Sequence, residues 1–256
     1  MAGSPLLTPA IVVGSIRYSE TSRIVRLATR EHGVVSAIAK GALRPRSRFG
    51  AALQLMSEGH AHLLPSRSSD LHTLVAFDLA ATHSGLANNL ERFGAASALA
   101  ELTARFVPPM ANPAVYDHLH DGIKLLELAP PEALAVVALR AQWRLISALG
   151  LGPTVAQCAR DAAALGSGAV AFSLRDGGFI CDACARLGAT TRLAATDRSD
   201  LVALLEPAAD LPLLESRQAA AHRRLLLRWV REHLGGDMPM PALEQWAGGE
   251  GLGARS

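Results

Sequence analysis

Three cysteines and one aspartate have the spacing of metal-binding knuckles. Cys158-Ala-Arg-Asp161 is followed, after nineteen residues, by Cys181-Asp-Ala-Cys184. This matches the zinc-ribbon pattern of two C-x2-C pairs, except that Asp161 stands in a cysteine position. Zinc takes four tetrahedral ligands and accepts a carboxylate oxygen among them, so the pattern predicts one structural zinc held by Cys158, Asp161, Cys181 and Cys184. Two alternatives stay open: a ribbon that has lost its metal and keeps buried or free thiols, and a thiol redox site.

The elements that must position these residues follow from the periodicity of the apolar side chains. Five short segments near the N-terminus have the pattern of strands, and together they supply enough chain for a small barrel. Beyond Ser84 the apolar period becomes helical. The predicted strands are 10–16, 23–30, 34–40, 52–64 and 71–79, and the predicted helices are 86–106, 115–126, 131–148 and 222–234.

This order predicts an α+β multidomain protein. Its N-terminal part is a five-stranded OB-type β-barrel, and an all-α domain with an embedded zinc-ribbon-like insert follows. We expect the barrel domain at residues 1–82, the helical domain at 83–154 and 191–247, the insert at 155–190 and a frayed tail at 248–256.

Composition excludes several classes of protein. Half of the 256 residues are apolar and 19% are charged, which rules out a disordered chain. No apolar stretch is long enough to span a bilayer, and the N-terminus has no secretory signal pattern, so we expect a cytoplasmic protein with no membrane partner. The sequence contains no nucleotide-binding or hydrolase motif, which disfavours an enzyme.

Positive charge is concentrated at the N-terminal end. Residues 1–50 contain eight Lys/Arg and two acidic residues, a net charge of +6, and the remaining residues contain 17 and 21, a net charge of −4. This asymmetry indicates an anionic partner for the N-terminal region, with nucleic acid favoured over a membrane surface. The alternative interpretation is a solvated strand surface in an arginine-rich chain.

Several N-terminal motifs resemble the signature of the RecO family of bacterial DNA-repair proteins. The similarity continues through the helix at residues 92–102, the cysteine insert and the last helix, so it covers nearly the whole chain. Asp161 departs from the pattern of the family members that bind zinc. The motifs are Glu20-Thr21-Ser22-Arg23-Ile24-Val25, His32-Gly33, Ala39-Lys40-Gly41-Ala42 and Pro45-Arg46-Ser47-Arg48-Phe49.

The resemblance implies a non-enzymatic function in DNA repair and recombination. A protein of this family is expected to bind single- and double-stranded DNA and to anneal complementary strands. With RecR it is expected to help RecA replace single-strand-binding protein, so the implied partners also include the RecA filament, indirectly. An apolar groove among the helices would suit the acidic and apolar C-terminal tail of single-strand-binding protein.

The basic residues of the predicted barrel form the candidate DNA-binding set. Lysine and arginine neutralise phosphates without regard to sequence, and the arginine plane can also stack on an unpaired base. Aromatic side chains are scarce in this region, and Phe49 is predicted either to stack a base or to close one end of the barrel. The set is Arg23, Arg26, Arg30, Lys40, Arg44, Arg46, Arg48 and Phe49.

Two other classes of function remain as alternatives. One is a protein-interaction scaffold whose barrel docks only protein partners. The other is a zinc- or thiol-dependent enzyme. DNA affinity that falls steeply with salt favours the first hypothesis over the scaffold, and turnover sensitive to chelation or alkylation would be required for the enzyme.

Overall fold

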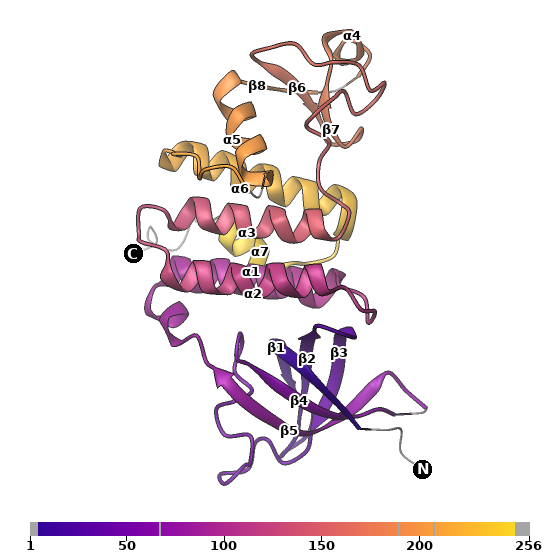
Figure 1. Ribbon diagram of the computed structural model, residues 1–256, viewed down its shortest axis with the longest axis vertical. Coiled ribbons are helices and arrows are strands. Elements are labelled where there is room, and N and C mark those ends of the chain that lie inside the picture. Colours follow the sequence, from indigo (N-terminus) through magenta and orange to yellow (C-terminus); the bar gives the residue numbers. More distant parts are fainter. Residues whose placement is uncertain (1–4, 67, 189, 207, 249–256) are drawn as a thin grey trace. The chain divides into compact units, whose positions relative to one another are not determined.

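The computed structural model describes residues 5–66, 68–188, 190–206 and 208–248 (Figure 1). The chain divides into two compact units, Met1–Ala129 and Pro130–Ser256, and each is described by itself. Among the described residues, no helix combines the length and the hydrophobicity needed to cross a membrane.

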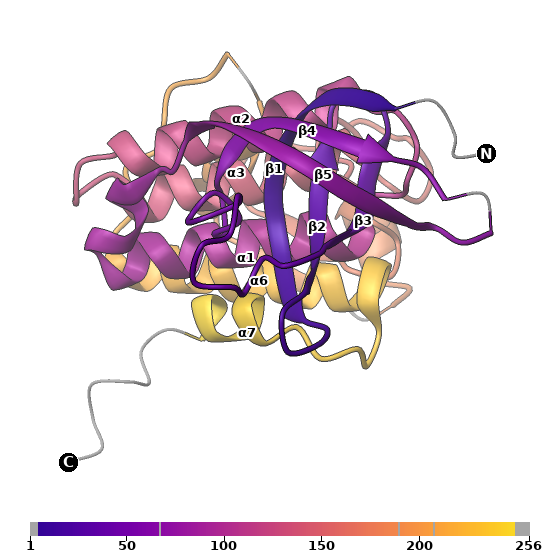
Figure 2. The ribbon, with the colours of Figure 1, turned by 90° about the horizontal axis from the view of Figure 1, so that it is seen from below.

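The first unit begins with a closed five-stranded barrel (Figure 2). Its strands are β1 Leu6–Arg17, β2 Arg23–Thr29, β3 Gly33–Ala39, β4 Glu58–Leu64 and β5 Leu71–Ala81. They close in the order β1-β2-β3-β5-β4, and only β3 and β5 are parallel. The prediction of a five-stranded OB-type barrel is confirmed. Alternate residues of the strands, such as Val25 and Leu27 of β2, face a common apolar core.

The fourth strand is shorter than the sequence predicts. The predicted strand at 52–64 begins only at Glu58, because residues 41–57 form a series of tight turns rather than extended chain. Phe49, Ala52 and Leu53 are buried in the barrel core. Their hydrophobicity therefore reflects a loop that plugs the barrel and not a strand with one buried face.

Three helical elements complete the first unit: η1 Ser84–Asn88, α1 Leu90–Phe106 and α2 Pro113–Leu128. The single helix predicted at 86–106 is wrong, because Asn89 interrupts it and caps α1 by accepting a hydrogen bond from the Arg92 backbone N–H. Helix α1 packs against β1 and β2. Gly33 has a φ of +64°, and a Cβ there would lie 2.1 Å from the Pro108 carbonyl oxygen, so glycine allows the β2–β3 turn to contact the end of α1.

The second unit is built on α3 Leu134–Ala148, α5 Ala195–Leu205, α6 Ser216–Val230 and α7 Pro241–Ala247, with a π-helical turn η2, Arg231–Gly235, after α6. The last predicted helix, 222–234, in fact begins at Ser216 and is α-helical only as far as Val230, where the π-helical turn takes over. Helices α5 and α7 escape prediction because they are short and bury few residues. Trp143 of α3 and Trp229 of α6 pack edge to face with ring centroids 6.1 Å apart at the centre of this unit.

The cysteine insert contains a three-stranded sheet in the order β7-β6-β8 and one helical turn. The strands are β6 Val170–Ser173, β7 Gly178–Ile180 and β8 Thr191–Leu193, and the helical turn is α4 Asp182–Ala185. The sheet thus extends three residues past the predicted boundary at residue 190. The Phe172 ring lies 5.8 Å from the Trp229 ring, which joins the insert to α6. Of the predicted tail, residues 249–256 lie outside the described residues.

Candidate nucleic-acid interface and metal centre

Strand register places three basic residues at one end of the barrel. Arg17 of β1 lies opposite Arg23 of β2, and Arg23 lies opposite Ala39 of β3, which Lys40 follows. Arg17 and Lys40 are exposed, and Arg23 is half-buried. Three neighbouring strands therefore bring a positive charge to the same edge.

The loop at residues 41–57 extends this basic edge. The Leu43 backbone N–H donates a 3.0 Å hydrogen bond to the Thr21 carbonyl oxygen, which holds the loop beside the β1–β2 turn. Arg44, Arg46 and Arg48 are all exposed. Within the part of the chain that the structure describes, none of these arginines forms an ion pair with a carboxylate. We call Arg17, Arg23, Lys40, Arg44, Arg46 and Arg48 the basic edge.

Phe49 lies beneath this loop rather than on its surface. Only 3% of the residue is exposed, and its ring packs in the barrel core. The Arg48 guanidinium carbon lies 5.0 Å from the ring centroid, in cation–π geometry. Of the two predicted roles, this position supports closure of the barrel end, and the buried ring offers no open face to a base.

Arg26 and Arg30, the other predicted residues of β2 and its end, lie apart from the basic edge. Arg26 is exposed at mid-strand, where partial burial and the nearby Arg105 of α1 lower the pKa of its guanidinium. Arg30 follows the opposite end of β2 and donates to both carboxylate oxygens of Asp117 at 3.0 and 3.1 Å. This bond holds the pKa of Asp117 below its usual range. The structure thus divides the predicted set by position along β2.

Two residues at the basic edge escaped the sequence-based set. Arg17 lies one residue past the predicted end of the first strand, although the charge count includes it. Tyr18 follows it in the β1–β2 turn and is 59% exposed. The loop between the first two strands of an OB-fold is a frequent contact for oligonucleotides, so the topology is the signal that could have identified this exposed aromatic ring.

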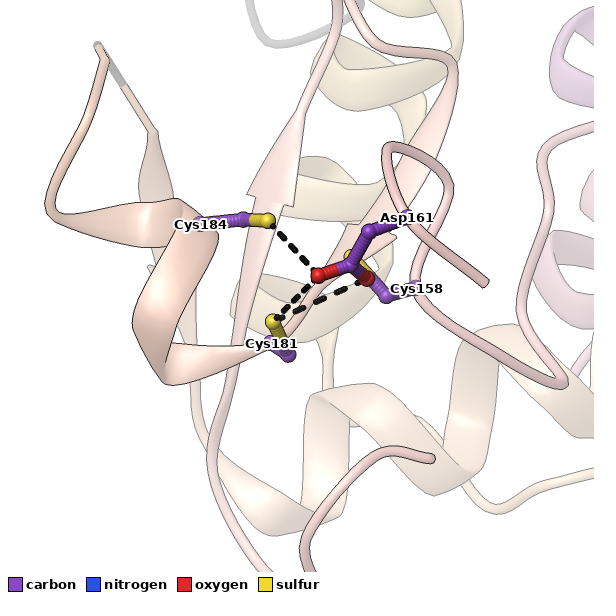
Figure 3. A group of neighbouring side chains, drawn as sticks. All are labelled: Cys158, Asp161, Cys181 and Cys184. Atoms are coloured by element: carbon purple, nitrogen blue, oxygen red, sulfur yellow. Dashed lines mark hydrogen bonds between the residues drawn. The ribbon is translucent and has the colours of Figure 1, made fainter. Parts of the chain in front are cut away.

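The four predicted metal ligands come together in the insert (Figure 3). One ligand atom from each of Cys158, Asp161, Cys181 and Cys184 lies within 4.8 Å of all the others. The Asp161 Oδ2 atom lies 3.6 Å from Cys181 Sγ and 3.1 Å from Cys184 Sγ. Tetrahedral zinc with bonds of about 2.0–2.3 Å separates its ligand atoms by roughly 3.5 Å, so this cluster could hold a metal ion.

Local structure explains how a chain with nineteen intervening residues forms this cluster. Cys158 and Asp161 lie on one turn, in which the Asp161 carboxylate accepts a hydrogen bond from the Ala163 backbone N–H at 3.0 Å. Cys181 is the N-cap residue of α4, and Cys184 lies within that helical turn. Arg160 connects the two halves, because it donates to the Cys184 carbonyl oxygen at 2.8 Å and forms a bidentate pair with Asp176.

Hydrogen bonds between the thiols and the Asp161 carboxylate shift the pKa values of both kinds of group. Hydrogen bonds from Cys158, the Ala163 backbone and Cys184 lower the pKa of Asp161. The hydrogen bond to Asp161, together with burial, raises the pKa of Cys184 to about 12. A thiol acts as a nucleophile or as a metal ligand only when it is deprotonated, so a metal ion bound here would have to displace the Cys184 proton.

Comparisons with known proteins agree with both halves of the architecture. Residues 1–83 match the family model described as Recombination protein O N terminal, and residues 87–241 match Recombination protein O C terminal. The chain is 33% identical over 231 residues to the DNA repair protein RecO of Anaeromyxobacter dehalogenans strain 2CP-C, which covers 88% of this chain and 90% of that protein.

A second relative comes from a different bacterium. The DNA repair protein RecO of Bacillus cereus strain AH187 is 33% identical over 176 residues, which covers 67% of each chain. The barrel, the helical region that follows it and these matches over most of the sequence agree. The chain therefore belongs to the RecO family of DNA-repair proteins.

Proposed function

We propose that this protein is a recombination mediator that binds single- and double-stranded DNA and anneals complementary strands without a catalytic step. It acts with RecR to help load RecA onto DNA coated with single-strand-binding protein, whose C-terminal tail it contacts. The observation that carries the proposal is the basic edge of the barrel, where six cationic residues from β1, β2, the end of β3 and one loop occupy a single edge.

The chemistry of the basic edge suits the phosphate backbone. Lys40, Arg44, Arg46 and Arg48 are exposed, and among the described residues no carboxylate competes for them. Residues 40–57 contain no acidic side chain. Contacts of this kind release condensed counterions and do not depend on base sequence, which is what a protein that acts at arbitrary sites of damage requires.

Tyr18 supplies the aromatic surface that this edge otherwise lacks. Its ring is 59% exposed in the turn beside Arg17. Stacking of a base on an aromatic ring contributes about 1–3 kcal/mol per base in single-strand binding and tolerates any sequence. We assign Tyr18 to unpaired bases and the cationic residues to the backbone, so Tyr18→Ala is expected to weaken single-strand binding more than duplex binding.

Strand annealing in the presence of single-strand-binding protein tests the proposal. Complementary oligonucleotides labelled with a donor and an acceptor fluorophore report annealing, with and without RecR. The variant Arg17→Ala/Arg23→Ala/Lys40→Ala should anneal more slowly than wild type. The matched control Arg175→Ala/Arg186→Ala/Arg192→Ala removes the same charge from exposed positions of the insert and its last strand and should anneal normally.

Measurements of DNA binding and of RecR association separate the proposal from a protein-interaction scaffold. A scaffold would bind RecR while showing no affinity for DNA even at low salt. Wild-type protein that fails to bind either form of DNA, yet still associates with RecR, would contradict the mediator function and support the scaffold.

We also propose that Cys158, Asp161, Cys181 and Cys184 hold one structural zinc ion. Cys158 and Cys184 are buried, and the four donors already lie at distances compatible with one tetrahedral ion. Zinc would supply cross-links between two short loops that bury little apolar surface of their own. With all four positions occupied by protein atoms, such a site has no open position for a reacting water, so its role is structural.

A further inference from the structure

A second group of potential metal ligands lies between two helices of the second unit. Asp197 and Asp200 are three residues apart on α5, which places them on one helical face. His222 lies on α6. One ligand atom from each of the three residues lies within 4.8 Å of the other two.

His222 of α6 is a buried polar side chain. It is only 4% exposed, and neither ring nitrogen finds a hydrogen bond among the described residues. An imidazole can present a ring-nitrogen lone pair to a metal ion. An unsatisfied buried group of this kind points to an ordered water or to a bound ion.

The two carboxylates provide the charge that a cation would neutralise. Asp197 and Asp200 are half-buried, and neither forms an ion pair within the described part of the chain. Two acidic groups therefore lie beside a buried histidine, and among the described residues no cation pairs with them.

We propose that Asp197, Asp200 and His222 form a binding site for a divalent transition-metal ion. Two carboxylate oxygens and one imidazole nitrogen suit Zn²⁺ or Mn²⁺ and differ from the thiolate-rich cluster of the insert. Both α5 and α6 pack on α3. An ion held by these three residues would link α5 directly to α6. The site is independent of the DNA-binding proposal and of the zinc proposed for the cysteines.

The competing cysteine cluster must be disabled before this site can be measured. Untagged full-length protein carrying Cys181→Ser/Cys184→Ser is dialysed against chelator, and binding of Zn²⁺ and of Mn²⁺ is then measured separately by equilibrium dialysis. We expect one equivalent of at least one of these ions to bind with a Kd below about 1 mM. Adding Asp197→Asn/Asp200→Asn should weaken that binding at least about tenfold, which corresponds to about 1.4 kcal/mol.

A matched control and a second readout make the test decisive. Glu232→Gln/Asp237→Asn removes two exposed acidic groups of the same unit and should leave affinity unchanged. The bound ion should also raise the melting temperature of the cysteine variant, and this increase should disappear with the aspartate changes. His222→Gln offers a third variant if it folds. Absence of binding for both ions, or equal affinity in the aspartate variant and the control, would overturn the proposal.

Discussion

The three arginines of the barrel loop lead to a quantitative prediction about salt. Arg44, Arg46 and Arg48 are exposed and lack carboxylate partners among the described residues, so each can contact one phosphate. The variant Arg44→Ala/Arg46→Ala/Arg48→Ala should therefore bind DNA more weakly and with less dependence on salt. It should lose affinity for unrelated sequences to a similar degree, because phosphate contacts carry no base information.

The expected magnitude follows from counterion release. Each lost phosphate contact reduces the slope of log affinity against log salt by about 0.9 for duplex DNA and about 0.7 for single strands. Three contacts give a reduction of about 2.7 and about 2.1, respectively. Between 50 and 200 mM salt, wild-type affinity for duplex should fall roughly 40-fold more than the affinity of the variant, and roughly 20-fold more for single strands.

Fluorescence anisotropy with labelled oligonucleotides of unrelated sequence measures these slopes. Arg175→Ala/Arg186→Ala/Arg192→Ala removes the same formal charge from exposed positions of the second unit and serves as the control for net charge. Circular dichroism establishes that both variants fold. Phe49 anchors the loop in the barrel core and is left intact, so the backbone that carries the arginines should persist.

Two results would refute this account of the basic edge. A folded loop variant that retains the wild-type slope would show that these side chains do not contact phosphates. Equal changes of slope in the loop variant and in the control would show that overall charge, and not the position of the arginines, sets the affinity.

Three further predictions concern the metal centre and an ion pair. Metal analysis of untagged protein purified without chelator should find about one zinc per chain, and Asp161→Ala should release zinc to a chelator faster than wild type, because it removes one of four ligands; a preparation without zinc would contradict this. Cys181→Ser/Cys184→Ser should lower the melting temperature, because the site supplies cross-links. At temperatures where this variant is folded, its annealing rate should stay within about threefold of wild type, because the site takes part in no chemical step. A tenfold loss of annealing rate would show that the insert takes part in annealing directly. Arg30 lowers the pKa of Asp117, so the stabilisation from this pair is present above the ordinary carboxyl pKa of about 3.9 and is lost as pH falls through the lower folded-state value. Urea titrations should therefore show Asp117→Asn to be less stable than wild type at pH 7, and this difference should vanish in acid. A stability difference that does not depend on pH would exclude the ion pair as its source.

Features that depend on neighbouring residues could be predicted from the sequence. The alternation of apolar residues along β2 and β3 predicts two strands that face a core, because the side-chain period of a strand is two. The two halves of the cysteine cluster are each local turns, so their spacing predicts a common site once the insert folds. The family resemblance is likewise carried by contiguous motifs, and the family matches confirm it.

The grouping of the basic residues depends on tertiary structure. Arg23 and Arg30 belong to the same predicted strand, yet register places the first beside Arg17 at one barrel end and the second against Asp117. Apolar character alone does not separate a ring that stacks a base from one that closes a barrel, and burial in the core places Phe49 with the second group.

The site on α5 and α6 illustrates the same limit most clearly. Asp197 and Asp200 form an ordinary helical pair in the sequence, and His222 lies more than twenty residues away on another helix. No local pattern links them, because their proximity arises from the packing of both helices on α3. Spacing along the chain determines which ligands share a turn, and only the packing of distant elements determines which of them can share an ion.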